Sequence, residues 1–210
     1  PEAAVFALEE DEEGEISGGT DVLCRQALLS DAVVVGPAMI DEGGAGLLVD
    51  ALLAEPSLEA HLVLDAAALL SLRARTLAVA TYPHPKLLTP HPGELQAMLG
   101  WSESEIAADP LGATVFAADR YQAVVMGKGA NTCIAHPDGR TAVYEGGGVG
   151  LATGGSGDVL AGIAAGLAAR GGDAWTAALW AVWLHGEAGR ACTREIGPVG
   201  YLARDLLARI

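Results

Sequence analysis

The sequence is short of basic residues: 12 lysines and arginines stand against 27 acidic residues in 210, a formal net charge of -15. Such a chain repels phosphate backbones and anionic membranes, so we expect neither nucleic-acid binding nor membrane binding. Cysteine is scarce as well. Cys24, Cys133 and Cys192 are odd in number and far apart, with no zinc-ligand spacing and no disulfide framework. We therefore expect a cytoplasmic protein.

Long hydrophobic runs are also missing. The longest, 159–169, lies between Asp158 and Arg170 and is shorter than the roughly 20 residues that cross a bilayer, so we expect a soluble protein. Aromatic residues are only 5% of the chain, but hydrophobic residues reach 51%, which excludes a disordered chain. The length fits one domain over 1–210. Pro1 in place of Met indicates that the natural chain begins earlier.

Short apolar runs alternate with longer stretches rich in alanine and leucine. Four runs end in turns loaded with Gly, Pro or Asp, and helical patterns such as 43–54 and 93–99 follow them; the runs are 32–35, 62–64, 87–88 and 124–126. The last third is expected to be helical, beginning with 159–170. This order predicts an α/β fold with a mostly parallel sheet, whose ligands bind at the carboxyl ends of the strands. A hairpin is expected over 132–144. The acidic run 9–15 is expected to be an exposed loop.

Tryptophans occur in the last helical pattern. Trp175, Leu179, Val182 and Trp183 recur at helical spacing, which favours a place in the core over a ligand platform. The four histidines outside the motifs below are interpreted as structural: His61, His84, His136 and His185.

Glycine is abundant, with 28 residues, and it is densest in the segment 146–158, GGGVGLATGGSGD, just before an apolar helix. Glycines let several backbone N–H groups gather around an anion, and a helix start adds unpaired N–H groups. The segment therefore predicts a phosphate site. The glycine spacing does not match a Rossmann loop, and Gly127-Lys128 is followed by Gly129 where a Walker loop needs Ser or Thr.

Asp158 ends this glycine segment. A carboxylate at a helix start can be a favourable first-turn charge worth about 0.3 to 1 kcal/mol. Beside a phosphate site it could instead deprotonate a hydroxyl that attacks a phosphoryl group. We favour this catalytic interpretation.

Five motifs together resemble the ADP/ATP-dependent NAD(P)HX dehydratases, a family of the ribokinase-like superfamily, from Pro1 to the C-terminus. They are Gly36-Pro37-Ala38, 64–69 (LDAAAL), 89–94 (TPHPGE), 128–132 (KGANT) and 154–158 (GGSGD). The resemblance implies a three-layer α/β/α fold. It also implies a repair reaction in which ADP or ATP phosphorylates the hydroxyl of hydrated NADH or NADPH, and phosphate then leaves to restore NAD(P)H, with AMP formed when ADP is the donor.

The resemblance also assigns site residues. It places Gly36, His91 and Asp158 on the hydrated cofactor, and Gly157 with the KGANT residues on the nucleotide; the latter are Lys128, Gly129, Ala130, Asn131 and Thr132. Gly154, Gly155 and Ser156 would complete the anion loop. Glu94 resembles a glutamate that organises Mg²⁺ through water, and a helix first-turn carboxylate is the equal alternative. Lys128 could otherwise be a solvated strand-end charge, and His91 a surface residue. Relatives imply a homo-oligomer.

The chain departs from the family pattern at three positions and at its front. Ala38 replaces the usual glycine, Ala67 an acidic residue and Gly148 an asparagine, and the strand-helix-strand unit that precedes Pro1 in the family is not in this sequence. Two other functions stay open. A small-molecule hydroxyl kinase would keep Asp158 and the anion loop, and a non-catalytic nucleotide-binding homologue would tolerate the departures.

Overall fold

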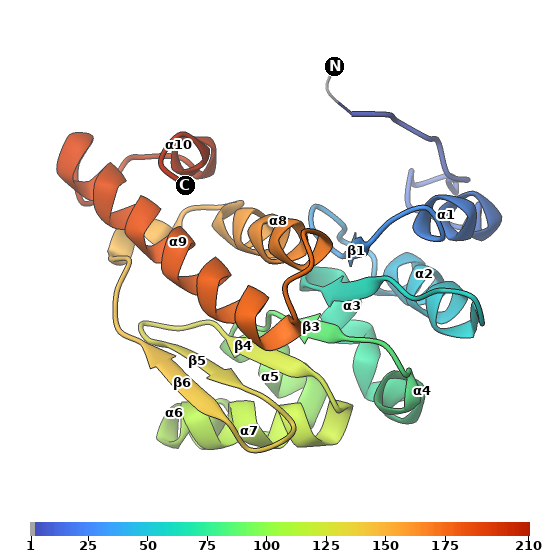
Figure 1. Ribbon diagram of the computed structural model, residues 1–210, viewed down its shortest axis with the longest axis horizontal. Coiled ribbons are helices and arrows are strands. Elements are labelled where there is room, and N and C mark those ends of the chain that lie inside the picture. Colours follow the sequence, from blue (N-terminus) through green and yellow to red (C-terminus); the bar gives the residue numbers. More distant parts are fainter. Residues whose placement is uncertain (1–2) are drawn as a thin grey trace.

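A six-stranded sheet forms the centre of the protein (Figure 1). The computed structural model describes residues 3–210, so Pro1, where the resemblance begins, lies outside the described residues. The strands lie in sequence order and are β1 (Ala32–Val35), β2 (His61–Leu64), β3 (Lys86–Leu88), β4 (Val124–Gly127), β5 (Thr132–Ala135) and β6 (Thr141–Tyr144). β1 to β4 are parallel to one another. β5 pairs antiparallel with β4, and β6 pairs antiparallel with β5. The mostly parallel sheet and the hairpin are confirmed.

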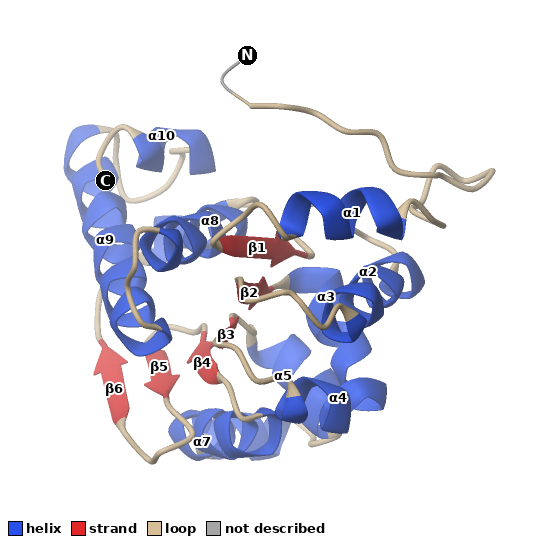
Figure 2. Cartoon of the chain, turned by 45° about the vertical axis from the view of Figure 1, so that its right-hand side comes forward, coloured by secondary structure: helices blue, strands red, loops and turns tan. Residues whose placement is uncertain are grey.

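Helices cover both faces of this sheet. They are α1 (Thr20–Ala27), α2 (Glu42–Ala54), α3 (Ala66–Leu70), α4 (Thr76–Thr81), α5 (Pro92–Leu99), α6 (Glu103–Ala108), α7 (Pro110–Tyr121), α8 (Ser156–Ala169), α9 (Ala174–Glu195) and α10 (Ala203–Leu207), with 3₁₀ turns η1 (Ser71–Arg75) and η2 (Val149–Ala152). Figure 2 shows α8 and α9 on one side of the sheet and α2, α3 and α5 on the other. The three layers confirm the predicted α/β/α architecture.

Successive side chains along a strand point to opposite faces of the sheet and so belong to two separate cores. Leu62 and Leu64 of β2 belong to the core that contains α2, α3, α5 and α7. Val63, between them, belongs to the core with α8 and α9. A strand buried on both faces needs apolar residues at successive positions, which is why these strands appear as unbroken apolar runs in the sequence.

The prediction for Trp183 is wrong, because its side chain is 46% exposed. Alanines take the inward positions of α9 instead, including Ala177, Ala178 and Ala181. Small side chains let α9 lie close against α8, so the bulky ring is turned outward against Trp180, at a centroid distance of 5.4 Å. Trp175 is partly buried against the core, as expected.

Two further local predictions can be compared with the structure. The acidic run 9–15 is an exposed turn, as expected, closed by an isolated bridge between Glu10 and Ile16. The helix expected from residue 159 begins earlier, at Ser156, so Asp158 lies within its first turn. Among residues 3–210, every helix falls short of the length and apolarity that a membrane crossing requires.

The turn after β1 holds an alanine in a strained conformation. The Met39 N–H donates to the Gly36 carbonyl at 3.0 Å, and Ala38, the third residue of this turn, has φ +61°. A β-turn with a positive φ at its third position favours glycine. We therefore expect Ala38→Gly to raise the free energy of unfolding by up to about 1 kcal/mol, measured by urea denaturation.

A matched control separates the backbone effect from the glycine itself. Ala51 lies in the last turn of α2, three residues before its end, so Ala51→Gly is expected to lower the free energy of unfolding by up to about 1 kcal/mol. If Ala38→Gly lowered stability as Ala51→Gly does, strain at Ala38 would be refuted.

Candidate functional site

A cleft of about 750 Å³ opens where the central strands end at their carboxyl termini. Its size suits a nucleotide or a similar small ligand. The walls come from the loops after β2, β3 and β4, from the glycine-rich segment after β6, and from the helices α8 and α9. The cleft therefore lies where open parallel sheets place their ligand sites.

The start of α8 offers free hydrogen-bond donors to this cleft. Gly155 is its N-cap residue, with φ +82°, and has no side chain that could accept from the first-turn amides. Within residues 3–210, the N–H groups of Gly157 and Asp158 have no hydrogen-bond acceptor, while Val159 N–H donates to the Gly155 carbonyl. Free amides at the positive end of a helix dipole form an anion site.

Lys128 stands beside this helix start in an ion-pair network. Its Nζ donates to Asp65 Oδ1 at 2.8 Å and lies 3.8 Å from Glu94 Oε2. Asp65 is only 2% exposed and also accepts from the Thr89 hydroxyl at 2.6 Å. A Cβ at Gly157 would lie 3.2 Å from Lys128 Nζ. The bare backbone of Gly157 thus lets the ammonium group and the free amides lie side by side.

The TPHPGE motif forms the start of α5. His91 is the N-cap residue: its Nδ1 accepts from Gly93 N–H at 3.0 Å and from Glu94 N–H at 3.3 Å. The Glu94 carboxylate accepts in return from His91 N–H at 2.7 Å. This reciprocal capping box, with Pro92 at the first helical position, explains the motif locally. The helix-start alternative for Glu94 is therefore what the structure contains, while a role toward Mg²⁺ remains a prediction.

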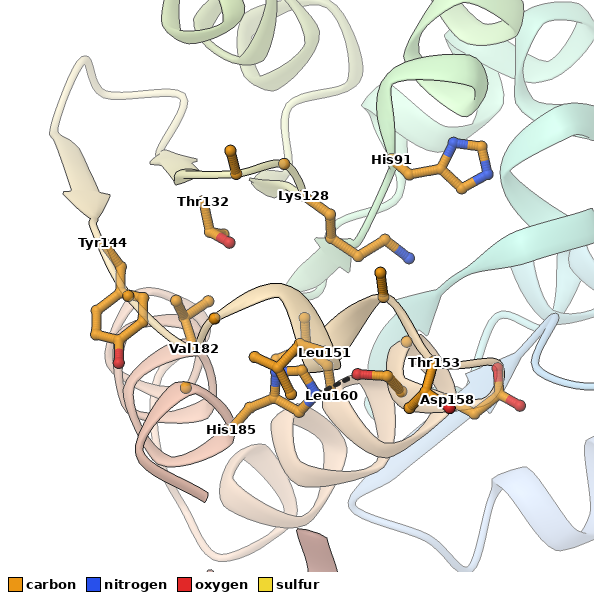
Figure 3. A pocket seen from close by; sticks show the side chains of 18 of the residues that line it. His91, Lys128, Thr132, Tyr144, Leu151, Thr153, Asp158, Leu160, Val182 and His185 are labelled. Carbon is orange, nitrogen blue, oxygen red and sulfur yellow. Dashed lines mark hydrogen bonds between the residues drawn. The ribbon is translucent and has the colours of Figure 1, made fainter. Parts of the chain in front are cut away.

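The cleft has a polar end and an apolar end, which Figure 3 shows. Lys128, His91 and Asp158 lie at the polar end. Tyr144 and Val182 lie toward the other end, and Leu151 lies between the two ends. The Tyr144 hydroxyl donates to Glu187 Oε1 at 3.1 Å. A planar, largely apolar ring fits the one end and a charged phosphate chain the other.

Most of the residues predicted from the sequence line this cleft. They are His91, Glu94, Lys128, Gly129, Ala130, Thr132, Ser156, Gly157 and Asp158. Four others are not part of its lining: Gly36, Asn131, Gly154 and Gly155. Gly36 has φ +116°, and a Cβ there would collide with the Asp65 carbonyl oxygen. Its position supports the loop that carries Asp65, and a contact with substrate stays a prediction.

His185 is the cleft residue that sequence reasoning interpreted as structural. It lines the cleft from α9, is 9% exposed, and its Nε2 lies 2.9 Å from Ser156 Oγ. Burial lowers the pKa of His185 to about 4, so its ring is neutral at pH 7. Its signal was present in the helical spacing, because His185 follows Val182 by three residues on the inward face of α9.

The full span 1–210 matches a family model described as NAD(P)H-hydrate dehydratase. The chain belongs to this family. The resemblance predicted from the five motifs is thereby confirmed. An ADP-dependent (S)-NAD(P)H-hydrate dehydratase from Xanthomonas campestris is 43% identical over 206 residues, which are 98% of this chain and 69% of that protein. A bifunctional NAD(P)H-hydrate repair enzyme Nnr from Moorella thermoacetica is 38% identical, and the match covers 98% of this chain and 39% of that protein.

Solved structures of other proteins share the fold. The Bacillus subtilis ADP/ATP-dependent NAD(P)H-hydrate dehydratase, co-crystallised with ATP and Mg²⁺, has a TM-score of 0.74 and 32% identity; the match covers 87% of this chain and 65% of that one. A ribokinase-like superfamily protein from Enterococcus faecalis has a TM-score of 0.75 and 25% identity, and covers 90% of this chain and 64% of that one. The predicted ribokinase-like fold is confirmed.

Proposed function

We propose that this cleft dehydrates hydrated NADH or NADPH at the expense of a nucleoside di- or triphosphate. The observation that carries the proposal is the meeting of three groups at one end of the cleft: the free amides of Gly157 and Asp158, the Lys128 ammonium group and the Asp158 carboxylate. Such a set positions a phosphoryl group, stabilises its charge and accepts a proton. Family membership supports the choice of substrate.

In the proposed reaction, the terminal phosphate of the donor lies against the α8 amides and Lys128. Asp158 accepts the proton of the ring hydroxyl as the hydroxyl oxygen attacks the terminal phosphorus, which releases AMP from ADP or ADP from ATP. Phosphate then leaves: the C–O bond breaks with its electron pair on the phosphate oxygen, the neighbouring ring carbon gives its proton to water, and the double bond of NAD(P)H returns. Tyr144 and Val182 would contact the base of the donor, because they form the apolar end.

The charges at the polar end of the cleft favour binding of the donor together with Mg²⁺. Three carboxylates, of Asp65, Glu94 and Asp158, line the cleft with the single ammonium group of Lys128. Residues 3–210 hold no group of three or more His, Cys, Asp or Glu side chains arranged to bind a metal. This donor set fits magnesium, which takes most ligands from water and substrate phosphates. Bound there, Mg²⁺ would neutralise the phosphate chain, and Glu94 would hold one of its waters.

The test is the recovery of NADH. Full-length protein is incubated with hydrated NADH, Mg²⁺ and either ADP or ATP, and the NADH absorbance is followed. We expect recovery with at least one nucleotide, and a loss of at least about a hundredfold when EDTA removes the metal, reversed by added Mg²⁺. No recovery with either nucleotide would refute the dehydratase function. Full activity in EDTA would refute the magnesium requirement alone.

A further inference from the structure

The ring of Tyr144 stands at the apolar end of the cleft (Figure 3). Tyr144 is the last residue of β6 and pairs across the hairpin with Thr132 of β5, which also lines the cleft. Side chains paired in this way lie on the same face of a sheet. Part of the ring packs against the core that contains α8 and α9, and another part lines the cleft. A ligand that fills this end therefore meets an aromatic surface.

The Tyr144 ring is held by charged groups of α9. Its hydroxyl donates to Glu187 Oε1 at 3.1 Å, and Arg190 donates to the same oxygen at 2.7 Å. Arg190 Cζ lies 5.6 Å from the centroid of the Tyr144 ring, which is a cation–π distance. Arg190 also donates to the carbonyl of Glu145, the next residue along the chain, at 3.1 Å. Burial, and the hydrogen bond to Glu187, raise the pKa of the Tyr144 hydroxyl, so it stays protonated at pH 7 and keeps donating.

Two glycines bring the backbone close to this ring. A Cβ at Gly186 of α9 would collide with the Tyr144 ring, and a Cβ at Gly146 would lie 2.7 Å from the Tyr144 hydroxyl oxygen. Neither glycine has a positive φ, so close approach to the ring is what each position requires. A ring that is packed on backbone and bonded at its hydroxyl loses little further freedom when a ligand binds, which favours affinity.

We propose that Tyr144 is the specificity-determining residue for the donor's base: a purine packs against its ring, so the cleft prefers purine to pyrimidine nucleotides. The proposal rests on the proposed function, which places the donor's base at the apolar end. A purine has two fused rings and overlaps an aromatic side chain over a larger area than a pyrimidine does. Glu187 and Arg190 do not line the cleft and are positioning residues for the ring.

ADP and UDP test the proposal, because they share the ribose and the phosphates and differ only in the base. Titration calorimetry on the full-length protein with Mg²⁺ gives both dissociation constants, by displacement where binding is weak. We expect wild type to bind ADP about tenfold more tightly than UDP. In Tyr144→Leu, the ADP dissociation constant should rise about tenfold and the two nucleotides should bind within about twofold of each other. The donor KM should rise with it, while kcat for NADH recovery stays within about threefold of wild type.

Conservative variants separate the ring from the groups that hold it. Tyr144→Phe keeps the ring and should keep most of the preference for ADP. Glu187→Ala releases the hydroxyl and should weaken ADP binding about threefold, whereas Glu187→Gln still offers an acceptor oxygen and should rescue it. Trp183 lies on the same helix, 46% exposed and outside the lining of the cleft. Trp183→Leu is therefore the control, and it should change neither dissociation constant.

The ratio of the two dissociation constants decides the outcome, because damage to the fold weakens both nucleotides alike. A wild-type ratio preserved in Tyr144→Leu would overturn the proposal. So would a rise in the KM for hydrated NADH in place of the donor KM, which would put the cofactor ring at the apolar end. A wild-type protein that selects ADP through Tyr144 but recovers no NADH would refute the dehydratase function and support the role of Tyr144. A wild-type protein that binds neither nucleotide would refute both.

Discussion

Asp158→Asn is expected to lower kcat for NADH recovery by about a thousandfold while ADP binds with wild-type or higher affinity. The substitution keeps the shape of the side chain but removes its ability to accept the hydroxyl proton. It also removes a negative charge from the end of the cleft that receives phosphate, so donor affinity should not fall. Initial rates at saturating donor and hydrated NADH give kcat, and calorimetry with ADP gives affinity.

A first-turn carboxylate elsewhere provides the control. Glu42 begins α2 and is exposed, outside the lining of the cleft. Glu42→Gln removes the same charge from the same kind of helix position, so both variants should lose stability by no more than about 1 kcal/mol. Only Asp158→Asn should lose activity. If the two variants had equal kcat values, Asp158 would act only as a favourable charge at the start of a helix and would have no catalytic role.

Lys128→Met is expected to weaken ADP binding at least about tenfold and to lower the free energy of unfolding by about 3 kcal/mol. The two effects have different causes. Affinity falls because the phosphate chain loses its one ammonium partner in the cleft. Stability falls because, among the described residues, Asp65, 2% exposed, keeps only the Thr89 hydroxyl as a donor to its buried charge. Calorimetry and urea denaturation measure the two quantities.

A second substitution at Asp65 separates these two roles of Lys128. In Lys128→Met/Asp65→Asn, the more deeply buried of the two carboxylates beside Lys128 is no longer charged, so most of the lost stability should return. ADP affinity should stay low, because the ammonium group is still missing. If affinity returned together with stability, Lys128 would act only by supporting the fold of the cleft.

The fold could be predicted from the sequence to a large extent because its strands are buried on both faces. Each of the four predicted runs became a parallel strand, with ends shifted by at most a residue or two. The loops that follow them converge because the carboxyl ends of parallel strands share one edge. The packing of the helices was harder to predict from the sequence. Trp183 has the spacing of a core residue, but alanines fill the inward face of α9 because α8 lies so close.

The candidate site was predictable where a motif is continuous in the chain, and less so where partners are distant. Most residues of the segments 128–132 and 154–158 line the cleft, whereas Asn131, Gly154 and Gly155 do not. The bond between Lys128 and Asp65 joins residues 63 positions apart, and that between Ser156 and His185 residues 29 apart. Such pairs depend on which strands are neighbours and on how closely two helices pack, neither of which local spacing specifies.

The hydrogen bonds among Asp65, Thr89 and Lys128 have a consequence for how the cleft adapts. They tie together the ends of three adjacent strands, β2, β3 and β4, and Lys128 N–H adds a bond to the Pro90 carbonyl at 2.7 Å. These bonded residues form the floor of the cleft, and they separate only when the middle of the sheet opens as one cooperative unit.

At the rim, Arg190 donates to the Glu145 carbonyl at 3.1 Å. Gly147 and Gly148, both at positive φ, take part in no side-chain hydrogen bond within residues 3–210. We therefore expect the rim to change shape for donors with longer or shorter phosphate chains, while the floor stays the same.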